Sequence, residues 1–268
     1  SFVVTSQNTS SDIKNLTSQV NNLEFEEFEK QLNVYFAGSD QTGDPKETYS
    51  SLNEIARAVS DSPKDPQALP KVYRYFGQLF QRQGNYDVAL ELFNKSLRIS
   101  RVGAFETLEA LTLNDIGNIF FKEGNLSRAE KQYQEALEIS QRLEDKHPLA
   151  VTYNNLALIE RKRENYPKAR ELHYTALDIR ESLSDDYLTG HSYTYIGDLN
   201  KIQGNILSAA EMYKKAISSF ESALAEKANQ SSKERNKIEL QIAFTELSLA
   251  DIYTRLDNKS EVLKILDH

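Results

Sequence analysis

Apolar residues recur along this chain at helical spacing, and the resulting stripes recur at a longer period. Tyr73, Phe76, Gly77 and Phe80 stand at i, i+3, i+4 and i+7, which is one face of an α-helix. The same frame returns every 40 residues. Such a period indicates stacked supersecondary units in place of one closed core. The small residue inside the stripe is Gly77, Gly117, Ala157 and Gly197 in turn.

Each stripe is followed by a turn and a second amphipathic segment. Glycine or asparagine in the left-handed conformation ends a helix at little cost. The short turn predicts two antiparallel helices, and because no pair buries its apolar faces alone, the pairs must stack. We therefore predict an all-α fold. The turns are Gly84-Asn85, Gly124-Asn125, Glu164-Asn165 and Gly204-Asn205, and each is followed by an alanine and a ring: Ala89 and Phe93, Ala129 and Tyr133, Ala169 and His173, Ala209 and Tyr213.

The small residues at the centre of the stripes call for a physical reason. Glycine inside a helix costs about 1 kcal/mol relative to alanine. Close approach of a neighbouring helix would offset that cost, so we expect these positions to lie at helix crossings. Because Ala157 replaces glycine in the third unit, we expect alanine to be tolerated at Gly117 and Gly197.

These motifs resemble the tetratricopeptide repeat (TPR), with its W-x-x-L-G-x-x-Y…A-x-x-x-F…P signature. The third unit, with His147-Pro148, Tyr153, Leu156-Ala157 and Asn165-Tyr166, is similar to the long repeats of kinesin light chain. The period is 40 where the usual unit has 34, and Arg101, Gln141 and Glu181 stand where the closing proline is expected. The resemblance implies a right-handed superhelix, an α–α solenoid. It also implies that the first helices line a concave surface, where asparagines clamp an extended peptide and basic residues hold its carboxylates.

Polar residues beside the stripe of each first helix form the candidate peptide-binding site. Asparagine is unfavourable inside a helix, so several on one face suggest a ligand, and an amide both donates to and accepts from a peptide backbone. The cations have a second explanation, since a basic residue in the last turn complements the helix dipole by about 0.3–1 kcal/mol. The predicted site comprises Arg74, Gln78, Arg82, Asn114, Asn118, Lys122, Asn154, Asn155, Arg161, Lys162, Asp198 and Lys201.

The two ends of the chain are less regular. We expect a disordered lead-in over 1–22, and over 23–69 either an N-terminal helical hairpin or a degenerate capping repeat. Four TPR units then occupy 70–226. Residues 227–268 are expected to hold a polar linker and a partial fifth unit. The short last helix and the start at Ser1 favour a fragment of a larger protein.

Composition and charge narrow the function. The net charge of −8, from 40 acidic and 32 basic residues, disfavours nucleic acid as a partner. No apolar run is long enough to span a bilayer. The absence of cysteine excludes disulfides and thiolate metal sites. The absence of cysteine does not decide the compartment. We slightly favour a cytoplasmic location, and the alternative is that the chain is an exported part of a membrane-anchored protein. No catalytic or metal-ligand motif is present, so we expect no enzymatic activity and no cofactor.

Three classes of function follow. The first is a non-enzymatic scaffold for protein–protein interaction that binds an extended, acidic peptide on the concave face. The second is a ligand-sensing or regulatory segment of a larger signalling protein whose output domain is absent here. The third is a structural or oligomerising array, and homo-oligomer formation is left open.

Overall fold

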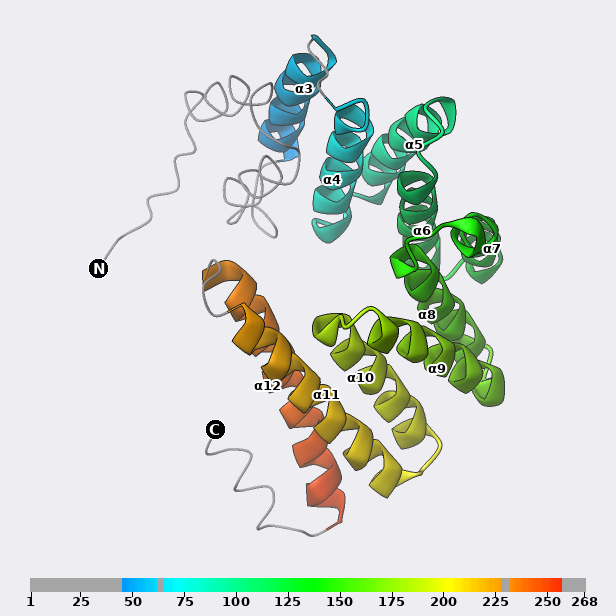
Figure 1. Ribbon diagram of the computed structural model, residues 1–268, viewed down its shortest axis with the longest axis vertical. Helices are drawn as coiled ribbons and strands as arrows, with labels where there is room; N and C mark the ends of the chain where they lie inside the picture. The colour runs from blue at the N-terminus through cyan, green and yellow to red at the C-terminus, as the bar shows by residue number, and fades with distance from the viewer. Residues whose placement is uncertain (1–44, 62–64, 228–231, 257–268) are drawn as a thin grey trace, which may run out of the picture. The chain divides into compact units, whose positions relative to one another are not determined.

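The computed structural model describes residues 45–61, 65–227 and 232–256, which form ten α-helices and contain no β-strand. The chain divides into two compact units, Ser1–Leu143 and Glu144–His268. In both units, consecutive helices pack as antiparallel pairs, and each pair stacks on the next (Figure 1). The fold is therefore all-α and of the α–α solenoid type, as the 40-residue period predicts.

The described part of the first unit contains one helix and two complete helix pairs. Large apolar side chains from all five helices form its core, including the fully buried Phe76, Phe80 and Phe93. The second helix of one pair packs on the first helix of the next, α5 on α6, so the core continues between the pairs. The helices are α3 (Pro45–Asp61), α4 (Ala68–Arg82), α5 (Tyr86–Val102), α6 (Glu106–Lys122) and α7 (Leu126–Arg142).

Among its described residues, the second unit contains two complete pairs and one further long helix. Its buried residues form smaller clusters, one around Leu177, Ile196 and Met212 and another around Phe220 and Ile238. The helices are α8 (His147–Lys162), α9 (Tyr166–Ser182), α10 (Asp186–Ile202), α11 (Ile206–Glu226) and α12 (Ser232–Arg255).

The turns inside the four pairs share one backbone conformation. Gly84, Gly124 and Gly204 have φ of 77 to 79°, which is the left-handed region that glycine adopts without a steric penalty. In the third pair Glu164 takes this position with φ of 62°. The asparagine that follows each of these residues caps the next helix with a negative φ. The predicted turns are confirmed, with the left-handed residue one place before the asparagine.

The small residues lie at helix crossings, as predicted. A Cβ atom built on Gly117 would lie 2.4 Å from Cε1 of Tyr133, and one built on Gly197 would lie 2.7 Å from Cε1 of Tyr213. Real Cβ atoms essentially never make contacts this short. Alanine, which was expected to be tolerated at these two positions, would therefore require the tyrosine ring to shift. Glycine is selected here because the ring of the second helix occupies the space of its missing side chain.

The ends of the repeat array differ from the sequence-based prediction in one place. Helix α12 begins at Ser232, inside the segment expected to be a linker. Residues 232–237 are polar, but they contain no glycine or proline to end a helix, and Ile238 anchors the segment with 2% exposure. The lead-in over 1–22, the first part of the expected hairpin or capping repeat (23–44) and the segment after Leu256 lie outside the described residues.

Candidate functional site

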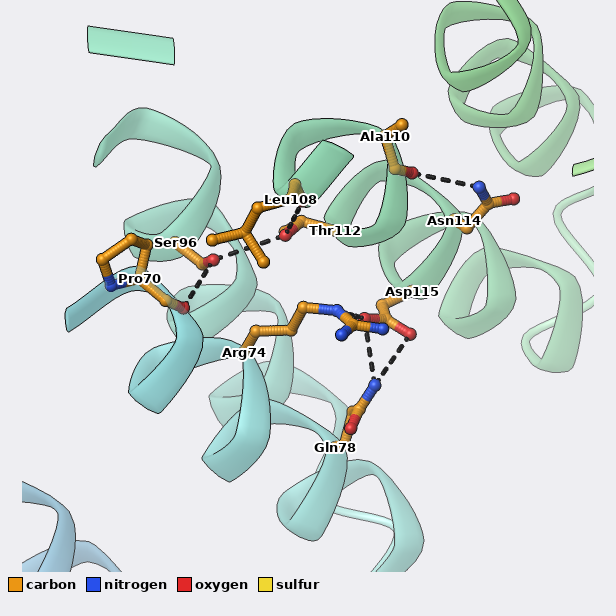
Figure 2. Close-up of polar contacts among 9 residues, drawn as sticks. All are labelled: Pro70, Arg74, Gln78, Ser96, Leu108, Ala110, Thr112, Asn114 and Asp115. Atoms are coloured by element: carbon orange, nitrogen blue, oxygen red, sulfur yellow. Dashed lines mark hydrogen bonds and ion pairs between the residues drawn. The ribbon is translucent and has the colours of Figure 1, made fainter. Parts of the chain in front are cut away.

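A buried carboxylate joins the first helices of the first two pairs. Arg74 Nε on α4 donates to Oδ2 of Asp115 on α6 over 2.6 Å, and Gln78 Nε2 lies 3.2 and 3.3 Å from the two carboxylate oxygens. Figure 2 shows both side chains of α4 converging on Asp115. Two of the three predicted site residues of α4, Arg74 and Gln78, therefore contact the neighbouring repeat in this structure.

Burial dominates the electrostatics of this cluster. Asp115 is 7% exposed, and this burial raises the pKa of its carboxyl above the usual value, while Arg74 and Gln78 act in the opposite direction. Removing one member of a buried pair leaves the other without compensation, which is strongly destabilising. The cluster therefore stabilises the packing of α4 against α6.

Other polar groups of the same region are satisfied locally. Asn114 Nδ2 donates to the backbone oxygen of Ala110, one turn earlier in α6. Ser96 donates to the backbone oxygen of Pro70 and lies 3.3 Å from Thr112 Oγ1 (Figure 2). Asn114 is 2% exposed. This predicted site residue lies inside the protein and is not part of its open surface.

In the second unit the asparagines of α8 are also buried. His173 Nδ1 on α9 donates to Asn154 Oδ1 over 2.9 Å, and the imidazole stacks on the ring of Tyr195 with centroids 5.5 Å apart. Asn154 and Asn155 are 5% and 7% exposed. Burial, with the nearby cations Arg161 and Arg180, lowers the pKa of His173 to about 3. The imidazole is therefore neutral, and its Nε2 is buried without a hydrogen-bond partner.

Two further site residues accept hydrogen bonds from the rings of the second helices. Tyr133 donates to Asn118 Oδ1 over 2.8 Å, and Tyr213 donates to Asp198 Oδ1 over 2.6 Å. Both acceptors follow the small glycine by one position. Lys201, the last site residue of α10, forms an ion pair with Asp251 of α12 over 2.7 Å.

The remaining site residues are basic and stand in the last turns of first helices, as predicted. Arg82, Lys122 and Lys162 are exposed, and Arg161 is half-buried. Within 45–61, 65–227 and 232–256, the structure gives Lys122, Arg161 and Lys162 no ion pair or side-chain hydrogen bond.

The site prediction omitted several residues that carry its polar contacts. Asp115 and Asp251 form ion pairs with predicted residues, and Tyr195 stacks on His173, which in turn bonds the predicted Asn154. Buried Arg180 donates to Ser192 Oγ over 2.6 Å. The sequence could have indicated Asp115, because this acidic residue stands one 40-residue period and one further position after the basic Arg74. Arg180 carried none, since serine stands at the same place in the two preceding repeats.

The part of the chain that the structure describes contains no group of three metal-ligating side chains. None of its helices combines the length and the apolar character that a bilayer crossing requires.

Comparison with known proteins identifies the family. The family model described as tetratricopeptide repeat matches residues 68–142 and 148–222, more than half of the chain and all four helix pairs. The chain belongs to the tetratricopeptide repeat family. No curated protein matched it.

Solved structures with the same fold include relatives of several kinds. BtubC (BKLC) from P. vanneervenii is 24% identical with a TM-score of 0.62, covering 80% of this chain and 90% of that one. A Rap protein complexed with competence and sporulation factor is 15% identical, with a TM-score of 0.61 and coverage of 96% and 74%. A Podospora anserina protein with putative kinesin light chain repeats is 16% identical, with a TM-score of 0.53 and coverage of 76% and 93%. At these identities the likeness concerns the fold.

Proposed function

We propose that this protein is a non-enzymatic interaction scaffold that binds an extended, acidic peptide on the faces of its first helices. The family supports a role in protein interaction, and the similar Rap protein is complexed with competence and sporulation factor. The observation that carries the acidic preference is a set of three cations, Lys122, Arg161 and Lys162, which form no ion pair with any residue that the structure describes. A charge without a partner in the free protein can form an ion pair with a ligand without first breaking another.

The buried asparagines take a different role in this proposal. Asn154 already accepts from His173, so replacing it would disturb the packing of α8 on α9 as well as any peptide contact. The test of the site therefore rests on Arg161 and Lys162, which stand side by side at the end of α8 and lie outside the apolar stripe.

The probe is a set of fluorescein-labelled ten-residue peptides that differ only in carrying no, two or four aspartates. Fluorescence anisotropy should show tighter binding as aspartates are added. This preference should shrink as salt is raised, because the Debye length falls from about 10 Å at 0.1 M to about 3 Å at 1 M. The double variant Arg161→Gln/Lys162→Gln should lose the preference for aspartate.

The matched control is Lys95→Gln/Lys168→Gln, which removes the same net charge from exposed ion pairs on second helices. This control should bind the four-aspartate peptide as the parent protein does. An equal loss of affinity for the four-aspartate peptide in both double variants would show that the effect depends only on net charge. This result would overturn the assignment of the site. Equal affinity of the parent for all three peptides would overturn the acidic preference.

A further inference from the structure

The first helices of the first unit hold a carboxylate that belongs to the protein itself. Arg74 Nε on α4 lies 2.6 Å from Asp115 Oδ2 on α6, and Gln78 Nε2 lies within 3.3 Å of both carboxylate oxygens (Figure 2). A guanidinium and an amide that converge on the two oxygens of one carboxylate form the arrangement by which a protein also holds the carboxylate of a ligand. Here the neighbouring repeat supplies the carboxylate.

The packing of the repeats does not itself require an acidic residue at this place. The residues one repeat before and one and two repeats after Asp115 are Tyr75, Asn155 and Tyr195, none of which is charged. Tyr75 and Asn155 are 6% and 7% exposed, so an uncharged side chain is buried there as deeply as Asp115. Burial raises the pKa of the Asp115 carboxyl, which means that its charged form is disfavoured in this position. The acidic residue is therefore a particular feature of the second repeat.

We propose that Asp115 occupies the place of a ligand carboxylate and thereby keeps acidic peptides off Arg74 and Gln78. Because Asp115 is part of the same chain, it competes with a peptide carboxylate at a high effective concentration. This inference rests on the proposed function and restricts it, since it closes this part of α4 to an acidic peptide. The guanidinium of Arg74 is within reach of a ligand once Asp115 is replaced, because 24% of its side chain is exposed.

The test is a gain of binding in a protein that lacks the cations of α8. In the Arg161→Gln/Lys162→Gln background, the labelled peptides with no and four aspartates should bind equally. Adding Asp115→Asn should restore a preference of about threefold or more for the four-aspartate peptide in fluorescence anisotropy, because Arg74 then receives a ligand carboxylate. Asp115→Ser also removes the carboxylate and should give the same gain. Circular dichroism establishes that each variant is folded at the temperature of the measurement.

Two further variants separate Arg74 from the general effect of charge. Adding Arg74→Gln to Asp115→Asn should cancel the gain, because the cation that receives the peptide carboxylate is then absent. The matched control is Asp87→Asn, which removes the same charge from an exposed residue in the first turn of α5. In the same background this control should create no preference for aspartate.

The inference is overturned if neither Asp115→Asn nor Asp115→Ser gives the folded protein a preference for aspartate. A gain that persists with Arg74→Gln, or that Asp87→Asn reproduces, would also overturn it. These outcomes are distinguishable from a failure of the proposed function. The proposed function fails if the parent protein binds all three peptides equally. The role of Asp115 fails by itself if the parent prefers aspartate and the Asp115 variants show no gain.

Discussion

The third repeat and its two neighbours solve the same packing problem with different residues. In the second and fourth repeats, a glycine of the first helix lies against the tyrosine ring of the second helix. The pairs are Gly117 with Tyr133 and Gly197 with Tyr213. In the third repeat the corresponding residues are Ala157 and His173, and both are completely buried. A five-membered imidazole is smaller than a phenol, so the added methyl group and the smaller ring balance within the same space.

The polar partner of the ring changes together with the ring. The two tyrosine hydroxyls donate to Asn118 and Asp198, one position after the glycine. In the third repeat that position holds Leu158, and the shorter histidine donates instead to Asn154, three positions before the alanine. The small residue, the ring and the acceptor therefore form one coupled set, and a substitution is tolerated only if the whole set permits it.

Overpacking the second repeat should give the largest effect. Gly117→Leu places a branched side chain where even a Cβ atom would lie 2.4 Å from the Tyr133 ring. We expect a loss of about 1–3 kcal/mol or more in the free energy of unfolding, measured by urea denaturation. Gly117→Ala should also destabilise the protein, and adding Tyr133→His should recover part of that loss, since the pair then matches Ala157 and His173.

The control for added apolar surface is Gln134→Leu, at an exposed position of the same second helix, which should change stability by no more than about 0.5 kcal/mol. If Gly117→Leu unfolds at the same urea concentration as the parent, the ring does not hold the place that the structure gives it.

The sequence predicted these packing positions but not their polar partners. Periodicity identifies which face of a helix is buried, and the glycine at its centre indicates a close crossing, so the helix pairs and the core position of His173 followed from spacing alone. A hydrogen-bond partner depends on side-chain direction and on the neighbouring helix, which the spacing does not contain. Asn114 and Asn154 therefore resembled surface residues in the pattern, although both are buried.

Acid should distinguish the two units through the histidines. All four histidines follow residue 143, and burial lowers the pKa of His173 to about 3 and that of His191 to about 4. An unfolded histidine has a pKa near 6.5, so below this value the unfolded state binds more protons than the folded state, and stability falls as pH falls toward the folded pKa. For His173 the loss approaches about 2 kcal/mol between pH 6.5 and 5.

Urea denaturation at pH 7 and pH 5 measures this loss, and hydrogen exchange at the same two pH values locates it. The second unit should open more readily at pH 5, with α8, α9 and α10 losing protection before α4 and α6. His173→Asn should reduce the difference between the two pH values. His147→Asn is the matched control, because it makes the same replacement at a histidine whose side chain is 43% exposed. An unchanged pH dependence in His173→Asn would contradict a neutral, buried imidazole.

The smallest effect concerns the turn of the third repeat, which also departs from its neighbours. Glu164 has a φ of 62° where the other three repeats have glycine. The left-handed conformation costs a residue with a Cβ roughly 1–2 kcal/mol, whereas glycine adopts it freely but loses more backbone entropy on folding. Because the cost of the left-handed conformation exceeds the entropic cost of glycine, Glu164→Gly should stabilise the protein by up to about 1 kcal/mol in urea denaturation.

The control for this change lies in the corresponding turn of the second repeat. Glu123→Gly alters an exposed residue of the same type whose φ is −73°, so it removes no strain and should destabilise the protein by a few tenths of a kcal/mol through the entropy of the unfolded chain. Opposite signs for the two substitutions would assign the gain at Glu164 to its backbone conformation, since both variants lose the same side chain. A loss of stability in Glu164→Gly would mean instead that the glutamate side chain contributes more to this turn than its backbone strain removes.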